Sequence, residues 1–540
     1  MTTSFPPINY PNKPVPPFSA PAPRNPFPGF FPDMWRNITG KPYVTVSSKG
    51  LANGLSEYFN DGADFGPDSL QSNGSLTQTT GIQEACTYLE PTGGEIKLTD
   101  GIFYFHTGVT YTSEAPLRIS GVRPNVTRGV TFTSEMSGGT FIIPASDYPT
   151  NNMPLFTFLN TTPGNNNGFV DIGNMGIIGT YIEVGDTVPD GASSTSPVAL
   201  QFGNTTSLEG GGPVAKNVHD MKIINCVSAI VSYSGGGPNL YDNLHVDGCG
   251  YNGTVTINGT SYTNPATFIF YELSQHWGKF EVFSPNGTDV FQYYNSAGGY
   301  APSILVDNIY SNIAGNDIFL INTTLNGVVL EIGNINVEGS ANNGNSVIGL
   351  PSSGSLTVYL ANLYQNGSSL VRQYNSSSTA RVDISVGNYH ATNSAGIVVN
   401  GNSVASGSRL AISNAYLESI VSGALSNSIT GLTWTMAHVY PVQTPTLSTN
   451  PPVSGTVYQN TNPYDIEIDL PVYATTAGTA GYVTMAKGST DTPTAISSQY
   501  VSGDTSSTST QIIKLRVPAG WYYSFTGSGV TFATATPFAE

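Results

Sequence analysis

A short apolar segment that ends in asparagine recurs at nearly constant spacing, and this repeat limits the possible folds more than any other feature. The copies are ILVDN, LEIGN, VYLAN, ISVGN and LAISN, ending at Asn308, Asn334, Asn362, Asn388 and Asn414. Upstream, VDIGN, NVHD and YDN place Asn174, Asp220 and Asn243 in the same frame. The five downstream copies are separated by 26, 28, 26 and 26 residues. A repeat of this length is typical of a solenoid.

Within each copy, the positions four before, two before and one after the asparagine are mostly apolar, as in Ile304, Val306 and Ile309. Alternation with a period of two indicates a strand, and the change of phase after the asparagine indicates a corner. One corner per coil of about 26 residues fits a parallel β-helix with three short strands per coil. Asparagine suits such a corner because it tolerates the left-handed conformation, and its amide can bond the asparagine of the next coil. We therefore predict a structural ladder that includes Asn243, Asn308, Asn334, Asn362, Asn388 and Asn414.

Charge is scarce, and this excludes some classes of partner. Only 10% of the residues are Asp, Glu, Lys or Arg, and the formal net charge is −17. A field of this sign repels phosphate backbones and anionic membranes, so we expect no nucleic-acid partner. No segment reaches the roughly 20 apolar residues of a membrane span, and the N-terminus lacks a basic stretch followed by an apolar one. We expect neither membrane insertion nor a secretion signal.

Composition divides the chain into four parts. Residues 1–45 hold 12 of the 37 prolines together with several aromatic residues, which predicts an extended arm. Residues 46–440 carry the repeat. Residues 441–465 form a linker rich in Pro, Ser and Thr. Residues 466–540 alternate short strands with Gly and Ser turns, which predicts a small β-sandwich.

One helix is expected near the start of the repeat region. Thr80 is the predicted N-cap, and Gln83 three residues later completes a capping box. Ile82, Ala85, Cys86 and Leu89 share one face, so Cys86 is predicted to be a buried apolar residue. The predicted fold is thus an all-β parallel solenoid with a short N-terminal capping helix and a C-terminal β-sandwich.

The same region carries a family resemblance. Three segments follow one another here: FNDGADFGPD (59–68), the predicted helix GIQEACTYLE and the predicted strands of GGEIKLTDGIFYF. In this order they resemble the opening of the pectate-lyase-like right-handed parallel β-helix superfamily. That superfamily contains polysaccharide lyases, polygalacturonases and viral tailspikes, and the tailspikes are typically trimeric. A proline-rich arm and a C-terminal β-module look most like the spike arrangement. IIKLRVPAGWYYSFTGSGVTF also resembles modules on surface proteins of viruses of acidophilic hot-spring archaea.

The resemblance implies a homotrimer on the virion surface or otherwise extracellular, with the arm bound to other virion proteins. It does not carry catalysis with it. The paired aspartates and the Gly-His-Gly of polygalacturonases are absent, and no calcium site of the pectate-lyase kind is visible.

Residues one before and two after the asparagine should point outward and form two columns. The first column is His219, Asp242, Trp277 and Asp307. The second is Lys222, His245, Phe280, Tyr310, Asn336, Tyr364, His390 and Tyr416. The frame around Trp277 is inferred across insertions. Outward aromatic rings beside hydrogen-bonding groups suit a glycan, because pyranose faces stack on rings. A subunit interface or an ordinary strand surface accounts for the same pattern.

A catalytic hypothesis rests on two carboxylates. Asp242 and Asp307 lie two coils apart, roughly 9 to 10 Å from the strand spacing, near the upper end of the inverting-glycosidase range. His245 could assist as a proton carrier.

Cys226 and Cys249 share one offset on neighbouring coils, which allows either a disulfide or stacked free thiols. The six histidines never cluster with cysteine at ligand spacing, so no metal site and no cofactor are expected.

These observations favour a virion spike that attaches to host-cell surface glycans. A polysaccharide depolymerase that uses carboxylates on the solenoid is the first alternative. A cellular secreted adhesin is the second.

Overall fold

The computed structural model describes residues between 43 and 539 with gaps, of which the longest are 50–62, 205–210, 295–300, 339–345, 418–424, 441–449 and 502–509. Residues 1–42, nearly all of the predicted arm, lie outside the described residues. The chain divides into two compact units, 1–325 and 326–540, which are described in turn.

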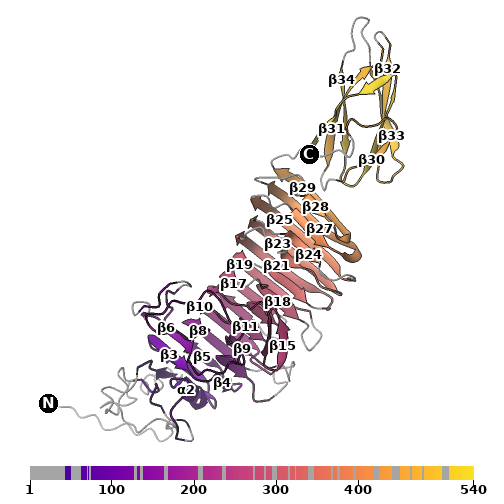
Figure 1. Cartoon of the computed structure of the whole chain (residues 1–540). Coiled ribbons are helices and arrows are strands. Elements are labelled where there is room, and N and C mark those ends of the chain that lie inside the picture. The colour runs from indigo at the N-terminus through magenta and orange to yellow at the C-terminus, as the bar shows by residue number, and fades with distance from the viewer. Residues whose placement is uncertain are drawn as a thin grey trace, which may run out of the picture. The chain divides into compact units, whose positions relative to one another are not determined.

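The first unit is built from coils of parallel strands that form two sheets (Figure 1). The first sheet runs β1 (Tyr43–Val46), β2 (Gly94–Leu98), β5 (Leu117–Ser120), β8 (Phe169–Ile178), β10 (Ala215–Ile224), β12 (Asn239–Asp242), β17 (Ser274–Ser284) and β19 (Ser303–Ile313). β13 (Leu244–Asp247) continues β12 and pairs with β10 and β17, while β3 (Gly101–Phe105) pairs with β6 (Thr140–Pro144), which also pairs with β8. The second sheet contains β4 (Val109–Thr112), β7 (Phe156–Leu159), β9 (Val198–Phe202), β11 (Ser228–Ser232), β16 (Phe268–Phe270), β18 (Phe291–Tyr294) and β20 (Phe319–Asn322).

Aromatic side chains fill the space between these two sheets. On the second sheet, the Phe291 ring stacks on Phe268 and Phe319, each with centroids 5.0 Å apart. From the first sheet, Trp277 packs 4.9 Å from Phe291 and 4.3 Å from Tyr241. Because each ring lies beside the equivalent residue of the next coil, the core is continuous along this unit.

A helix covers the beginning of the solenoid, as predicted. It is α2 (Ile82–Leu89), and it buries Ile82, Ala85, Cys86 and Leu89. The predicted N-cap is wrong, because Gly81 with φ 85° occupies that position. The Thr80 hydroxyl instead donates to the Tyr104 carbonyl at 2.9 Å, and the neighbouring Thr79 hydroxyl accepts the Gln83 N–H at 3.0 Å.

A hairpin is inserted between β13 and β16. It consists of β14 (Thr254–Ile257) and β15 (Thr260–Thr263), an antiparallel pair within an otherwise parallel unit. Its two-residue turn has φ 47° at Asn258 and φ 78° at Gly259, the conformation that favours Asn-Gly. Val255, Ile257 and Tyr262 are buried in a cluster against the second sheet.

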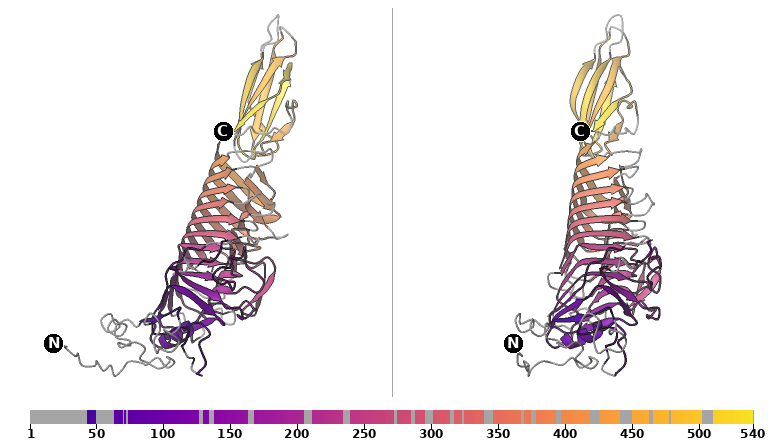
Figure 2. Two further views of the ribbon diagram at one scale, coloured as in Figure 1. Left: turned by 60° about the vertical axis from the view of Figure 1, so that its left-hand side comes forward. Right: turned by 90° about the vertical axis from the view of Figure 1, so that its left-hand side faces the viewer.

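The second unit repeats the same coil more regularly (Figures 1 and 2). One parallel sheet contains β21 (Val328–Glu338), β23 (Ser355–Asn366), β25 (Arg381–Thr392), β27 (Ser403–Leu417) and β29 (Thr430–Tyr440). The other contains β22 (Ser346–Gly349), β24 (Ser369–Gln373), β26 (Ile397–Gly401) and β28 (Leu425–Asn427). The repeat keeps register, since Asn334 pairs with Asn362, Asn362 with Asn388, and Asn388 with Asn414.

Two four-stranded antiparallel sheets form the C-terminal sandwich. The first contains β30 (Val457–Gln459), β35 (Tyr522–Ser528), β32 (Gly481–Gly488) and β33 (Thr494–Val501). The second contains β34 (Gln511–Val517), β31 (Ile466–Ala474), β36 (Val530–Phe532) and β37 (Thr536–Ala539). The predicted all-β fold, with a parallel β-helix, a short helix and a C-terminal sandwich, is confirmed.

The sandwich begins earlier than its sequence suggests. β30 lies within the stretch expected to be a linker, and it pairs with β35. The Asn450 amide exchanges two hydrogen bonds with the backbone of Ala535, at 2.9 and 2.7 Å. The Pro, Ser and Thr content of this stretch did not indicate these contacts, because the partners of β30 and Asn450 lie far along the chain, in β35 and at Ala535.

The corner predicted at the asparagine has two forms. Asn174, Asp220 and Asn243 have φ between 51° and 56°, in the left-handed region. The five asparagines from Asn308 onward are not among the described residues with positive φ, and strands such as β19 and β21 run through them. The expected left-handed corner is therefore correct for the coils that carry Asn174, Asp220 and Asn243 and wrong for those from Asn308 onward.

Candidate functional site

Strand register places two of the predicted outward residues in the core. Trp277 pairs with Tyr241 and Val306, both inward residues, and has no exposed surface. Phe280, paired with Leu244 and Ile309, is 2% exposed. The prediction that both rings face outward is wrong.

The frame slips by one residue because Lys279 holds the ladder position, opposite Asn308. Gly278 and Glu281 therefore occupy the outward positions of this coil. The Asp242 carboxylate lies over Gly278, where a Cβ atom would come within 2.1 Å of Oδ1. The same oxygen accepts the Lys279 N–H at 2.9 Å, so Asp242 is held by the backbone of the next coil.

His219 is held between two carboxylates. Its Nε2 lies 2.8 Å from Asp171 and its Nδ1 lies 2.8 Å from Asp220. The hydrogen bond to Asp171 raises the pKa of His219, and the hydrogen bond to Asp220 raises it further. Together these two bonds outweigh burial, which lowers the pKa. Arg123 lies 3.5 Å from the other oxygen of Asp220. Since both ring nitrogens contact carboxylates, His219 links Asp171 to Asp220 and has no free nitrogen for a ligand.

Two further candidates are covered by neighbouring groups. Lys222 Nζ donates to the Val126 carbonyl at 3.1 Å and to Asn125 Oδ1 at 3.3 Å. Burial lowers the pKa of this ammonium. His245 Nδ1 lies 3.0 Å from Glu281, and its ring packs 5.5 Å from Phe283.

The catalytic candidates do not share a partner. Asp307 lies 3.1 Å from His276 Nε2, and both side chains are nearly half exposed. Asp242 stands two coils away with Gly278 between them, and its Oδ1 accepts a backbone N–H.

The sequence analysis did not identify His276 and Asp171, which lie three positions before the ladder position. Period-two alternation marks that position as outward, so the signal was available.

In the second unit, three predicted residues form an aromatic column: the exposed Tyr364 and Tyr416 and, between them, the half-buried His390. The Tyr364 and His390 rings lie 4.9 Å apart, nearly perpendicular, and the His390 and Tyr416 rings lie 6.2 Å apart. Tyr364 is 37% exposed and Tyr416 is 42% exposed. The half-buried Tyr310 of the first unit packs beside Phe283, 5.6 Å away. Asn336 holds the same column position as Tyr364 in the preceding coil.

An amide ladder runs beside the aromatic column. Nδ2 of Asn362 donates to Oδ1 of Asn334 at 2.8 Å, Asn388 donates to Asn362 at 2.8 Å, and Asn414 donates to Asn388 at 3.0 Å. In the first unit, Asn243 donates to Asp220 in the same way. Each amide carries two N–H groups and two lone pairs, and the ladder uses only part of them. Rings and amides therefore repeat together, once per coil, as an apolar stripe beside a hydrogen-bonding stripe.

Cys226 and Cys249 are stacked free thiols, one of the two arrangements that their spacing allowed. The Cys226 N–H donates to Cys249 Sγ at 3.4 Å, and both side chains are buried. Burial raises the pKa of the Cys226 thiol, which makes it unreactive.

Among the described residues, no helix is long and apolar enough to cross a membrane. Within the same part of the chain, no three His, Cys, Asp or Glu side chains gather as metal ligands.

No protein-family model and no curated protein matches the chain. Several solved structures are similar to it, and two of them illustrate the low identity. One is tailspike protein 2 of the Escherichia coli O157:H7 bacteriophage CAB120, with 11% identity and a TM-score of 0.29. The other is Pantoea stewartii WceF, a glycan biofilm modifying enzyme with a tailspike-like parallel β-helix fold, with 12% identity and a TM-score of 0.21. Each alignment covers 85% of this chain, which spans 66% and 61% of those chains. The strand pairing of the chain itself establishes that it is a parallel β-helix protein.

Proposed function

We propose that this protein is an attachment spike on the surface of a virus particle and that it binds a host-surface glycan through the aromatic column. The observation that carries the proposal is the column of the exposed Tyr364 and Tyr416 and the half-buried His390, which lies beside the amide ladder. Sugars bind where a ring meets the apolar face of a pyranose and polar groups meet its hydroxyls. One ring and one amide per coil suit a polymer that lies along the strand stack.

The sequence resemblance to tailspikes supports the location and the assembly. Under this proposal the chain is a homotrimer, residues 1–45 contact other virion proteins, and the site faces the cell exterior. Sedimentation of the full chain tests the trimer. Antibody labelling of released particles tests the virion location, and label confined to uninfected cell surfaces would instead support a cellular adhesin.

The binding claim is tested by retention of the full chain on host-envelope polysaccharide, together with an assay for new reducing or unsaturated ends. The double variant Tyr364→Ala/Tyr416→Ala removes two rings, each worth about 0.5–1.5 kcal/mol, so we expect retention to fall about tenfold or more. Tyr482→Ala/Tyr500→Ala is a matched control, because these rings are 53% and 54% exposed, lie 5.4 Å apart and belong to the sandwich.

Retention by the wild type and the control, with loss in the column variant and no new ends, supports the proposal. Equal retention by all three proteins contradicts the role of the column. Release of new ends that disappears in Asp242→Asn or Asp307→Asn would make the protein a depolymerase.

A further inference from the structure

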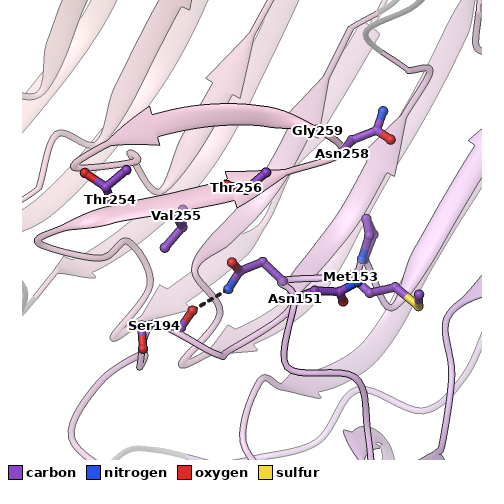
Figure 3. Close-up of a pocket in the computed structure, with 10 residues that line it drawn as sticks. Asn151, Met153, Ser194, Thr254, Val255, Thr256, Asn258 and Gly259 are labelled. Carbon is purple, nitrogen blue, oxygen red and sulfur yellow. Dashed lines mark hydrogen bonds between the residues drawn. The ribbon is translucent and has the colours of Figure 1, made fainter.

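A pocket of about 510 Å³ lies in the first unit, on elements that hold none of the column residues. Its walls come from three separate places in the sequence: the loop around Asn151 and Met153, the loop at Ser194, and the hairpin strand with Thr254 and Thr256 (Figure 3). The volume falls within the range of small-molecule sites, about 300–1,000 Å³. The pocket is therefore large enough for a single sugar unit.

The lining defines the chemistry of a ligand. All ten residues that line the pocket in the described part of the chain are uncharged. Met153, Pro154 and Val255 supply apolar surface, while Asn151, Ser194 and Thr256 supply amide and hydroxyl groups. Because a charged ligand would find no counter-ion here, the pocket favours a neutral molecule with both an apolar face and hydroxyl groups.

The loop side of the pocket is fixed by internal hydrogen bonds. The Asn152 amide donates to the carbonyls of Ser194 and Ser196 at 2.7 and 2.8 Å, which ties two of the three walls together. The Tyr148 hydroxyl lies 3.0 Å from the Pro154 carbonyl, and desolvation by burial raises the pKa of this tyrosine. These contacts hold the wall in one conformation before any ligand arrives.

The hairpin side is fixed by buried tyrosines. The Tyr262 hydroxyl lies 3.0 Å from that of Tyr233 and 3.2 Å from that of Tyr271, and Tyr262 is itself 4% exposed. Val255 and Ile257 anchor the other strand in the same cluster. The hairpin is an insertion whose two strands pair with each other and with neither solenoid sheet. Loops and insertions on a rigid scaffold commonly carry binding sites.

We infer that this pocket binds one neutral monosaccharide unit, as a site distinct from the aromatic column. The inference does not depend on the proposed function, because it uses no residue of the column. A neutral sugar meets the apolar surface around Met153 with one face and the hydroxyl and amide groups of the hairpin and loops with its edges.

Saturation-transfer NMR on the full chain tests the inference, with the methyl glycosides of glucose, galactose, mannose and N-acetylglucosamine as probes. We expect transfer to at least one of them in the wild type. Thr256→Trp fills the pocket and should abolish that transfer. Ser303→Trp is the control, because Ser303 is an exposed strand residue of the same unit, on β19, and does not line the pocket.

If Thr256→Trp fails to fold, Thr256→Ala replaces it, and loss of one hydroxyl contact should weaken binding about fivefold. Absence of transfer from all four sugars overturns the inference, and so does transfer that persists unchanged in the pocket variants. Transfer that survives in Tyr364→Ala/Tyr416→Ala but not in Thr256→Trp separates this site from the column.

Discussion

The two units carry the same sequence repeat but use its outward positions in opposite ways. In the first unit the corner residues Asn174, Asp220 and Asn243 adopt the left-handed backbone conformation. Nearby polar groups such as His219 already form ion pairs and hydrogen bonds within the protein. In the second unit the amides bond to one another along the ladder, and the adjacent rings Tyr364 and Tyr416 remain exposed. One periodic signal thus specifies a coil, while the side chains around it decide whether its surface is closed or open to a ligand.

The largest expected effect concerns buried against exposed aromatic rings. Trp277→Ala removes a fully buried ring in contact with Tyr241 and Phe291, and should lower the free energy of unfolding by about 3–5 kcal/mol. Tyr364→Ala in the second unit should change it by about 1 kcal/mol or less, because this ring is partly exposed and its contact is with His390. Chemical denaturation followed by circular dichroism measures both.

Trp277→Phe keeps an aromatic ring in the core and serves as the milder variant, with a loss between these two values. The strand register that places Trp277 inside is wrong if Trp277→Ala lowers the free energy of unfolding no more than Tyr364→Ala does.

The next effect separates the two kinds of corner. Asn243→Val forces a branched residue into a backbone with φ 51°, at a cost of about 1–2 kcal/mol, and also loses the bond to Asp220. Asn388→Val loses two ladder bonds but meets no left-handed backbone, so it should cost less. The difference is measured as the shift in the denaturation midpoint.

Asn243→Gly is the control, since glycine adopts positive φ without strain. The corner interpretation is wrong if Asn243→Val and Asn388→Val destabilise equally while Asn243→Gly is as harmful as Asn243→Val.

The smallest effect is a dependence on pH in the first unit. Burial raises the pKa of Asp289 to about 6, from about 3.9 in the unfolded chain. Its contribution to stability is therefore complete below pH ~3.9 and is lost as the pH rises through about 6. The raised pKa of His219 acts in the same direction, since its contribution is complete below about pH 6.5 and is lost above that, as the pH passes the folded pKa.

The free energy of unfolding should therefore fall as the pH is raised from about 4 to about 8. Asp289→Asn should flatten the acidic part of this profile because an amide does not titrate, and its oxygen can still accept the Asp317 N–H that Oδ1 accepts at 3.0 Å. His219→Gln should flatten the neutral part. Profiles for both variants that parallel the wild type would show that these groups do not set the pH dependence.

Much of the fold could be predicted because its signals are local. The spacing of Asn334, Asn362, Asn388 and Asn414 gave the coil, and all four stand in register. The prediction failed where an insertion changed the spacing. The β14–β15 hairpin lengthens the interval before Lys279, and a lysine in the ladder position hid the frame, so Trp277 and Phe280 were assigned to the wrong face. The pocket on that hairpin could not be predicted, because its walls come from loops far apart in the sequence.

The sequence by itself determined the all-β solenoid, its period, its capping helix and its C-terminal sandwich. These follow from alternation and spacing along a single strand or coil, which is information that a chain carries locally. Only the tertiary structure decided which outward residues remain available. Lys222 is covered by Asn125, 97 residues away, and His219 is held by Asp171, 48 residues away. Burial and hydrogen bonding at the surface depend on segments that meet only when coils stack, so no local pattern could assign them.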